Sequence, residues 1–519
     1  MNSLCRLAFG LLVGLVPLVE ISAQEQTPEP LDVGSRRELF VDGSLIGQMS
    51  GQARWELHQP TPREIVLVHD APWEGSGSGY HSVFHDGERY RMYYKAWHLD
   101  VTPERVSTTS HPGFCCYAES DDGIHWRKPN LGLHEFNGSK DNNITIISEK
   151  IGAAHLDSAH PAVFLDKNPD APPEGRFKAI VRSNGPHGLL ALQSADGLRW
   201  SLMQEAPVLT DGAFDSQNLA FWDPVRREYR AYWRYFTEGV ANGREWNPSG
   251  HRDIRTATSK DFLHWSEGRD LVYQDSPPEH LYTNQVAPYD RAPHLLIGFP
   301  TRYIERGWSD SMKALPELEH RQWRAAGSGR YGTAITEALF MASRDGYQFK
   351  RWEEAFLRPG IERPGTWNYG HQYLAWRPVE TKSALEGAPN ELSFYATESY
   401  WTGKSSEVRR YTLRLDGFTS ISAPMAGGEI VTNPIQFAGK ELRLNFSSSA
   451  AGDVRVEIQD IDGKPLPGFG LDDCPPIFGD SIERTVTWKS GGDVSGLAGR
   501  PVRLRFSLRD ADLFAFQFQ

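Results

Sequence analysis

Three carboxylates in this 519-residue chain have the type and placement for acid–base chemistry: Asp157, Asp215 and Glu398. The two aspartates lie shortly before apolar runs, and Glu398 ends such a run. Cleavage of a glycosidic bond needs two carboxyl groups, one protonated to release the leaving oxygen and one ionised to attack or to activate water. Burial or a nearby carboxylate would raise the pKa of the acid, while Arg182 or Arg234 would hold the other group ionised. We take the three carboxylates as the candidate catalytic residues.

Other hydrogen-bonding and aromatic side chains recur at matching places around the apolar runs. Most of them lie six residues before a recurring Asp, or at the end of the strand that follows that Asp. Lys95 also lies at such a strand end. The candidate substrate-binding residues are Tyr80, His81, His160, Arg182, Gln217, Asn218, Arg234, Tyr282, Asn284, Arg302 and His371. Imidazoles, amides and guanidiniums suit a polyhydroxylated ligand, and aromatic rings can stack on sugar faces. We expect a carbohydrate partner.

These residues are positioned by a motif that the chain repeats. It reads Ser-Asp-Asp-Gly-Ile-His-Trp at 120–126 and returns at 194–200, 259–265 and 343–349. Asp-Gly favours a tight turn between two strands, because Gly accepts a positive φ and Asp binds its own backbone. The third copy has Phe262 in place of Gly, which predicts a different turn there. A second repeat, an apolar strand ending in aromatic-x-Asp, precedes each copy and ends at Asp86, Asp166, Asp223 and, more loosely, Asp290.

Each unit therefore holds two hairpins, and five units can be counted. This pattern predicts an all-β protein: a five-bladed β-propeller over residues 24–424, followed by a small β-sandwich over 425–519. The aromatic content of 12%, with 48 Gly and 34 Pro, agrees with many strands and turns. A short strand at 39–42 is expected to close the ring. Propeller geometry places the repeated acids on the face away from the pocket, where they are structural.

The first residues predict export. A basic residue and an apolar run over 7–19 precede Ile21-Ser22-Ala23, which resembles a small-residue cleavage site. Residues 1–23 are therefore expected to be a signal peptide, with a mature chain from Gln24 that is periplasmic or extracellular. No later stretch is apolar enough to cross a membrane.

Charge and ligand spacing restrict the partners. A formal net charge of −12 argues against nucleic acid. No tight His-x-x-x-His spacing indicates a metal site, so we expect no cofactor, while a structural cation held by His160, His371 and carboxylates in the channel stays open. The oligomeric state also stays open.

Several stretches resemble a known family. They are 38–42, 117–132, 214–218, 343–346 with 358–360, 503–506 and 514–518. Through them the chain resembles exported bacterial five-bladed propellers related to the amino-terminal domains of family thirty-two glycoside hydrolases, with a C-terminal sandwich. The resemblance implies action on glycosidic bonds. The signatures Trp-x-Asn-Asp-Pro, Arg-Asp-Pro and Glu-Cys are absent, so the catalytic residues of those enzymes are not carried over.

Two alternatives to a glycoside hydrolase remain. A non-catalytic, lectin-like propeller would bind glycans without turnover. A sialidase-like enzyme would need six blades, by family resemblance, and an arginine cluster for a substrate carboxylate, which Arg182, Arg234 and Arg302 could supply.

Overall fold

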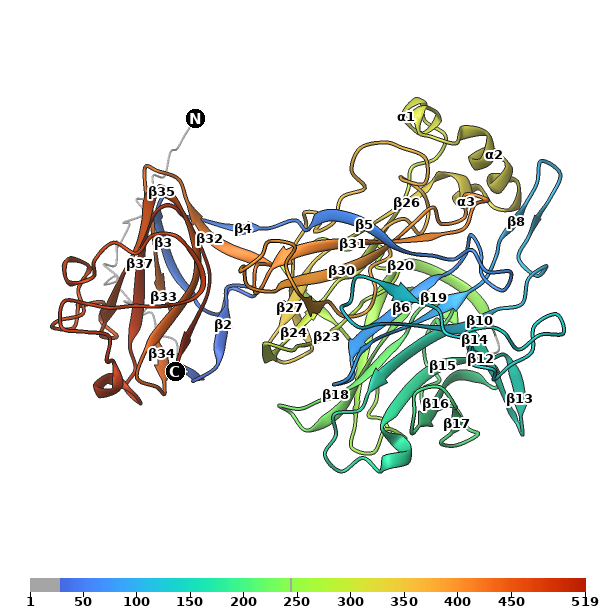
Figure 1. The fold of residues 1–519 in the computed structure, drawn as a ribbon, viewed down its shortest axis with the longest axis horizontal. Helices are drawn as coiled ribbons and strands as arrows, with labels where there is room; N and C mark the ends of the chain where they lie inside the picture. The colour runs from blue at the N-terminus through green and yellow to red at the C-terminus, as the bar shows by residue number, and fades with distance from the viewer. Residues whose placement is uncertain (1–28, 243–244) are drawn as a thin grey trace, which may run out of the picture.

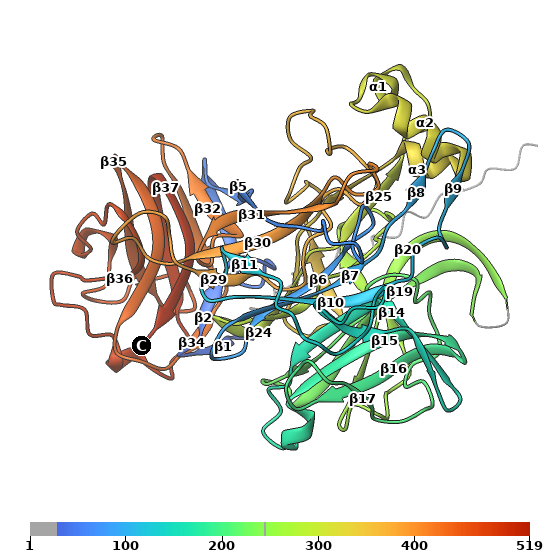
Figure 2. The same cartoon turned by 45° about the vertical axis from the view of Figure 1, so that its right-hand side comes forward.

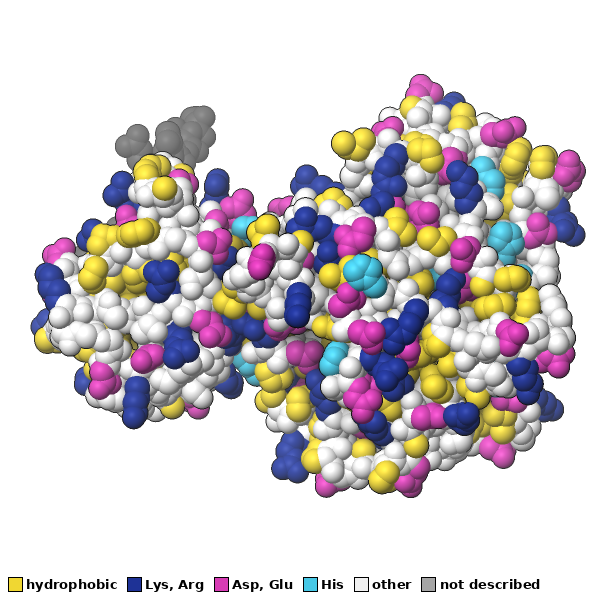
Figure 3. Space-filling model, in the orientation of Figure 1, with side chains coloured by type: hydrophobic (Ala, Val, Ile, Leu, Met, Phe, Trp, Pro, Cys, Tyr) yellow, Lys and Arg dark blue, Asp and Glu magenta, His cyan; other side chains and the backbone are white. Residues whose placement is uncertain are grey.

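The computed structural model describes residues 29–242 and 245–519, which form two lobes (Figure 1). The expected signal peptide, residues 1–23, lies outside the described residues. Among the described residues, no helix is long and apolar enough to cross a membrane. Basic and acidic side chains are interspersed over the face seen in Figure 3, so this face carries no continuous patch of one charge.

The larger lobe is a five-bladed β-propeller, as predicted, and each blade is a sheet of four or five strands. Blade one contains β6 (Gly79–His85), β7 (Tyr90–Ala96), β10 (Phe114–Ser120), β11 (Trp126–Arg127) and β12 (Ile144–Ile147). Blade two contains β13 (Glu149–Ile151), β14 (Ala154–Leu165), β15 (Phe177–Gly185), β16 (His187–Ser194) and β17 (Ser201–Leu202). Blade three contains β18 (Leu219–Asp223), β19 (Glu228–Ala241), β20 (Trp246–Ser259) and β21 (Arg269–Asp270).

The last two blades use strands from distant parts of the chain. Blade four contains β22 (Val272–Gln274), β23 (Ala287–Tyr289), β24 (Ala292–Gly298), β27 (Met341–Ser343) and β28 (Gln348–Arg351). Blade five contains β29 (Val379–Thr381), β30 (Glu391–Glu398), β31 (Glu407–Arg414) and β5 (Thr61–Val68). Strand β5 pairs antiparallel with β31, so an N-terminal strand completes the last blade and closes the ring. The strand expected to do this, at 39–42, does not: Leu39 pairs instead with Ala515 in the other lobe.

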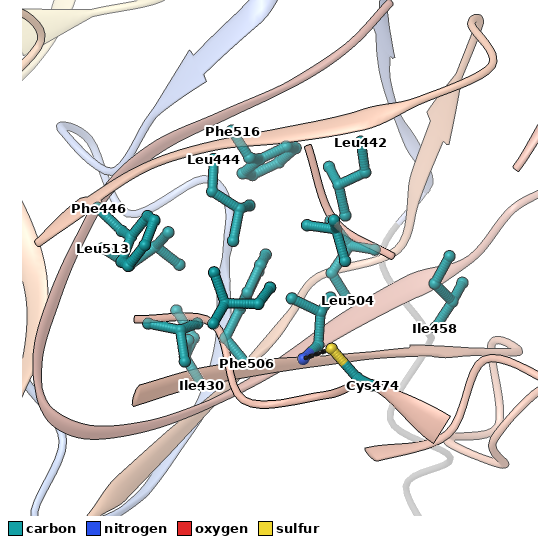
Figure 4. Close-up of a cluster of buried hydrophobic side chains, with 14 of the residues drawn as sticks. Ile430, Leu442, Leu444, Phe446, Ile458, Cys474, Leu504, Phe506, Leu513 and Phe516 are labelled. Atoms are coloured by element: carbon teal, nitrogen blue, oxygen red, sulfur yellow. Dashed lines mark hydrogen bonds between the residues drawn. The ribbon is translucent and has the colours of Figure 1, made fainter. Parts of the chain in front are cut away.

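The smaller lobe is a β-sheet lobe built mainly on two long strands. It contains β2 (Arg37–Leu39), β3 (Ile46–Gly51), β4 (Arg54–Leu57), β32 (Thr419–Ala423), β33 (Gly428–Thr432), β35 (Leu442–Gln459), β36 (Asp480–Thr485) and β37 (Arg503–Phe518), with β1 (Leu31–Gly34) beside β34 (Ile435–Phe437). Its apolar side chains gather in one buried cluster that includes Leu444, Phe506 and Phe516 (Figure 4). The predicted boundary at residue 425 therefore leaves out N-terminal strands, because residues 31–57 pair with this lobe rather than with the propeller.

The repeated motif forms the same turn four times. In each copy the Ser hydroxyl donates to the Asp carboxylate at 2.9 to 3.1 Å and accepts the N–H three residues after the Ser. The prediction of a different third turn is wrong: Phe262 takes φ +70°, as the glycines do. Its ring is fully buried against Phe164 and Tyr229, and this packing compensates for a backbone conformation that bulky residues rarely adopt.

One end of the propeller carries insertions that the sequence analysis did not anticipate. A hairpin of β25 (Thr301–Glu305) and β26 (Ala334–Ala338) frames α1 (Asp310–Ala314), α2 (Leu318–Gly327) and α3 (Gly329–Thr333). Helix α2 packs against the small hairpin of β8 (Asp100–Val101) and β9 (Val106–Ser107), at the same end (Figures 1 and 2). Three short 3-10 turns, 173–175, 471–473 and 495–497, complete the described elements.

Candidate functional site

A cavity of about 530 Å³ opens at the propeller end that carries the helical insertion. All five blades contribute to its wall, which includes Tyr80, Lys95, Asp157, His160, Arg182, Asp215, Tyr282, Tyr369 and Tyr400. A second cavity of about 340 Å³ adjoins it and shares Asp215, Tyr282 and Arg330. The two together make a pocket with two compartments, and Asp215 lies where they meet.

Asp157 is held by three partners on blade two. It lies in β14 where the pairing with β15 is interrupted, between Asp157 and Ala162. Its carboxylate accepts the Ala159 N–H at 2.9 Å and lies 3.1 Å from the Nδ1 of His160 and 3.5 Å from Arg182. Burial raises the pKa of Asp157, but these partners outweigh burial and lower the pKa below its usual value.

Asp215 lies in the loop before β18, and its carboxylate pairs with Arg234 of β19. The arginine side chain is 3% exposed and the aspartate side chain 39%, so the carboxylate faces the pocket from above a buried cation. Burial raises the pKa of Asp215, but Arg234, His160 and Arg182 together lower it. Both aspartates therefore share His160 and Arg182 as neighbours that lower their pKa.

Glu398 does not join this pair. Its buried carboxylate accepts from Arg409 at 2.7 Å and from Arg363, and it is not part of the wall of either compartment. Burial raises its pKa, but these two arginines and His371 lower it. The expectation of one carboxyl with a raised pKa is thus not met, since the pKa of all three candidates is lowered.

Lys95, at the end of β7, is a buried cation of the pocket whose pKa is brought close to neutral. Burial lowers its pKa to about 8, against an opposing effect of Asp157. Its ammonium lies 3.5 Å from the hydroxyl of Tyr400 and 4.5 Å from the ring centre of Trp97. Lys95 is mostly protonated at pH 7 and can release its proton without a large change of conditions, which suits a proton donor.

Aromatic side chains form one wall of the pocket. Tyr373, which is buried and not itself part of the wall, stacks between the wall residues Tyr80 and Tyr282, each at 5.7 Å between ring centres, and the hydroxyl of Tyr369 lies 2.7 Å from that of Tyr282. Trp401 packs on Tyr369 at 4.6 Å. Burial and mutual proximity raise the pKa of Tyr80, Tyr369 and Tyr373, so these hydroxyls stay neutral hydrogen-bonding groups. Such a wall offers both ring faces and hydroxyls to a sugar.

Five predicted ligand residues are buried in the propeller instead. His81 contacts His69, the two ring nitrogens being 3.2 Å apart, and His371 Nδ1 accepts the Trp367 N–H at 3.0 Å. Asn218 and Asn284 bind backbone carbonyls of blade three. Arg302 also lies elsewhere, between Glu279 and Glu337, so the arginine cluster of the sialidase-like alternative is incomplete, and residues 29–242 and 245–519 form five blades rather than six.

The fifth of these residues, Gln217, closes the channel. Its amide donates to the carbonyls of Tyr80 at 2.9 Å and Pro161 at 3.2 Å, and it accepts from Gln285 at 2.8 Å. Gln285 also donates to the carbonyl of Leu374 at 2.8 Å. The two amides thus link all five blades across the axis, and neither lines the pocket.

Sequence reasoning missed the residues that the insertion and the long β19–β20 hairpin bring to the pocket. Arg330 and Tyr331 come from α3, and Arg252 and Trp246 from β20. The insertion lies inside blade four and carries no copy of the repeat, so no repeat position pointed to it. In the part of the chain that the structure describes, no three His, Cys, Asp or Glu side chains are grouped to hold a metal ion.

Comparisons with known proteins give likeness of fold at low similarity. No protein-family model and no curated protein matches the chain. Among solved structures, the chain is similar to a thermostable family-43 glycoside hydrolase (13% identity, TM-score 0.41), with 68% of this chain and 95% of that one covered. It is also similar to a family 117 glycoside hydrolase from the marine bacterium Zobellia galactanivorans (10%, TM-score 0.38, 70% and 90%).

A further structure of similar fold is an N-acetylgalactosamine deacetylase from F. plautii in complex with blood group B trisaccharide (10% identity, TM-score 0.42, 69% of this chain and 94% of that one). These structural neighbours include glycoside hydrolases and one deacetylase. Similarity this low carries no conclusion about activity, which must come from the pocket. None of the three is described as family thirty-two, so that resemblance stays a prediction.

Proposed function

We propose that this protein cleaves glycosidic bonds of oligo- or polysaccharides in the two-compartment pocket, with Asp157 and Asp215 as its carboxylate pair. The observation that carries the proposal is the position of Asp215: half-exposed, paired with buried Arg234, and placed where the two compartments meet. A sugar chain lying across both compartments would present its linkage to this carboxylate.

The proposed reaction would use a few groups of the pocket, each with its own role. Ionised Asp215 would attack the anomeric carbon or take a proton from water, and Asp157 would stabilise the positive charge that develops on the sugar ring. The leaving oxygen needs a proton, and the carboxyls are held ionised. Lys95, with a pKa near 8, and His160, bound to Asp157, are the candidate donors.

The test is a reducing-end assay on the chain from Gln24 with a broad panel of oligo- and polysaccharides. Asp157→Asn and Asp215→Asn should each lower the rate by about 100-fold or more. Asp211→Asn is the matched control, because this nearby side chain is 80% exposed and pairs with Arg255 outside the pocket. New reducing ends that both pocket variants leave unchanged would reject the assignment of the site.

A lectin-like role is the outcome if glycans bind and none is cleaved. The aromatic wall would serve binding equally well, and the arginine pairing of both aspartates is compatible with a site that has no turnover. Export is part of the proposal and rests on residues 1–23 alone. Fractionation of the producing cells tests it, since retention of the full-length chain in the cytoplasm would reject it.

A further inference from the structure

Two of the three arginines that line the second compartment have no carboxylate partner among the described residues. Arg234, Arg252 and Arg330 all reach it, together with His280. Arg234 is paired with Asp215, the one carboxylate in the wall of this compartment. Among the described residues, neither Arg252 nor Arg330 has a carboxylate within ion-pair distance. We call the compartment around Arg252, His280 and Arg330 the arginine compartment.

Aromatic rings fix both unpaired guanidiniums in place. Arg252 lies 4.6 Å from the ring centre of Tyr303 and 5.2 Å from that of Phe236. Arg330 lies 5.1 Å from the ring centre of Tyr331 and 5.6 Å from that of Tyr369. Stacked guanidiniums of this kind are positioned before a ligand arrives, so less conformational freedom is lost on binding.

The same arginines have unused hydrogen-bond donors. The Nε of Arg252 and one terminal nitrogen of Arg330, Nη1, are buried without an acceptor. His280 lies 3.3 Å from Nη1 of Arg252 and supplies no negative charge, and burial, Arg252 and His251 lower its pKa. Glu305 is close, but it accepts the Tyr303 hydroxyl at 2.6 Å. Buried donors without acceptors cost free energy, so an anionic ligand that supplies acceptors here would bind favourably.

We propose that the arginine compartment binds an anionic substituent of the sugar chain, a uronic acid carboxylate or a sulfate ester. The proposal rests on the proposed function, because the compartment adjoins Asp215 and would hold the sugar unit next to the cleaved linkage. Planar guanidiniums match both oxyanions by paired N–H···O bonds. Trp246 of β20, half exposed at the rim, supplies a ring face for the same unit.

Binding is measured by titration calorimetry, with no turnover needed. The probes are galacturonic acid oligosaccharides and their methyl esters, and a sulfated oligosaccharide and its desulfated form. We expect the acidic member of at least one pair to bind at least ten-fold more tightly than its neutral partner, and this preference to shrink as salt is raised. The pair that shows the difference identifies carboxylate or sulfate.

The variants Arg252→Met and Arg330→Met should each weaken binding of the acidic probe at least ten-fold and leave the neutral probe unchanged. Arg269→Met is the matched control, since this exposed arginine stacks on Tyr347 outside the pocket. Melting temperatures identify any variant that does not fold. In that case Arg252→Lys or Arg330→Lys, which keeps the charge, replaces it and should weaken binding of the acidic probe less than the Met variant would.

Equal binding of acidic and neutral probes, or acidic binding that the arginine variants leave intact, would overturn the proposal. Cleavage of glycans together with acidic-probe binding that both arginine variants leave intact would reject the arginine compartment and keep the proposed function. Tight, arginine-dependent binding of an acidic sugar without cleavage would reject the proposed function and keep the arginine compartment.

Discussion

Arg234 lies beneath Asp215 and pairs with it, the cation almost fully buried and the carboxylate 39% exposed to the pocket. Arg234 favours the ionised form of Asp215, and the exposed side of the carboxylate stays open to a ligand. Arg234 is fixed in turn by Tyr282, whose ring centre lies 4.9 Å from the guanidinium. Arg234 therefore contacts both the aromatic wall and the candidate catalytic carboxylate.

Replacement of Arg234 by Met should move the acidic limb of the pH–rate profile to higher pH. Arg234 is the largest of the effects that lower the pKa of Asp215, so without it the effect of burial would raise that pKa. The measurement is kcat/KM against pH for the variant and the wild type. Arg255→Met is the control, because this arginine pairs with Asp211 and Asp270 outside the pocket. An unshifted acidic limb would show that Asp215 does not control the rate.

Lys95 should limit activity at alkaline pH and stability at neutral pH. If it donates the proton, the rate falls as pH rises through about 8, and Lys95→Met loses about 100-fold or more at all pH values.

The stability effect has the opposite direction. The folded pKa is about 8 against 10.5, so the native state binds fewer protons between these values, and burial of the charged form is unfavourable below pH 8. Lys95→Met should therefore stabilise the fold at pH 7, by at most about 3 kcal/mol, with the gain vanishing above pH 10. Urea denaturation at pH 7 and pH 10 measures it. A variant that is less stable at pH 7 than at pH 10, relative to wild type, would contradict this reading.

Gln217 should matter for stability and not for chemistry. Gln217→Leu removes the acceptor for one hydrogen bond of Gln285, which keeps its bond to Leu374, and leaves the carbonyls of Tyr80 and Pro161 without their buried donor, at a cost of about 3 kcal/mol. The rate per folded molecule should stay within about two-fold of wild type. If Gln217 contacted substrate, KM would rise instead while the denaturation midpoint stayed constant, and the two measurements separate these roles.

The contrast between Gln217 and Asp215 shows how far sequence reasoning reached. The blades were predictable because each repeated turn is local, with Ser, Asp and the positive-φ residue inside seven positions. It was not predictable which of the residues before the first strand of a blade face the pocket. In blades three and four these residues precede β18 and β23, so the alternation of side chains along a strand does not apply to them. There Asp215 turns to the pocket and Gln217 to the axis.

Remote pairings were also beyond prediction. Strand β5 pairs with β31, which lies more than 300 residues later in the chain. Nothing in the sequence of either strand indicates which strand it pairs with. Arg252 and Arg330 reach the pocket from a long hairpin and a non-repeating insertion, where periodicity gives no register. The pairing of Glu398 with Arg409 could be foreseen from the sequence, whereas Arg363, which also lowers the pKa of Glu398, comes from a separate loop.

Asp416 should hold the two lobes together in a pH-dependent way. It is fully buried between β31 and β32 and accepts from Arg291 at 2.8 Å, Arg37 at 3.0 Å and the Tyr289 hydroxyl at 2.7 Å. Tyr289 and Arg291 belong to blade four, while Arg37 lies in β2 of the smaller lobe. One carboxylate thus balances two arginines that come from different lobes.

Asp416→Asn keeps the shape but removes the one fully buried carboxylate that the two arginines share, leaving Arg37 with Glu483 at 2.8 Å and Arg291 with Glu380 at 3.8 Å, so we expect a loss of about 3 kcal/mol in the free energy of unfolding. Burial raises the pKa of Asp416, but Arg291 and Arg37 outweigh it and lower the pKa. The contribution is therefore present above the unfolded pKa of about 3.9 and is lost as pH falls through the lower folded value. Urea denaturation at pH 7 and at decreasing pH measures both effects, with Asp290→Asn, a 65% exposed partner of Lys167, as a control within about 0.5 kcal/mol of wild type. A variant that loses no more stability than this control would show that the two lobes are held by other contacts.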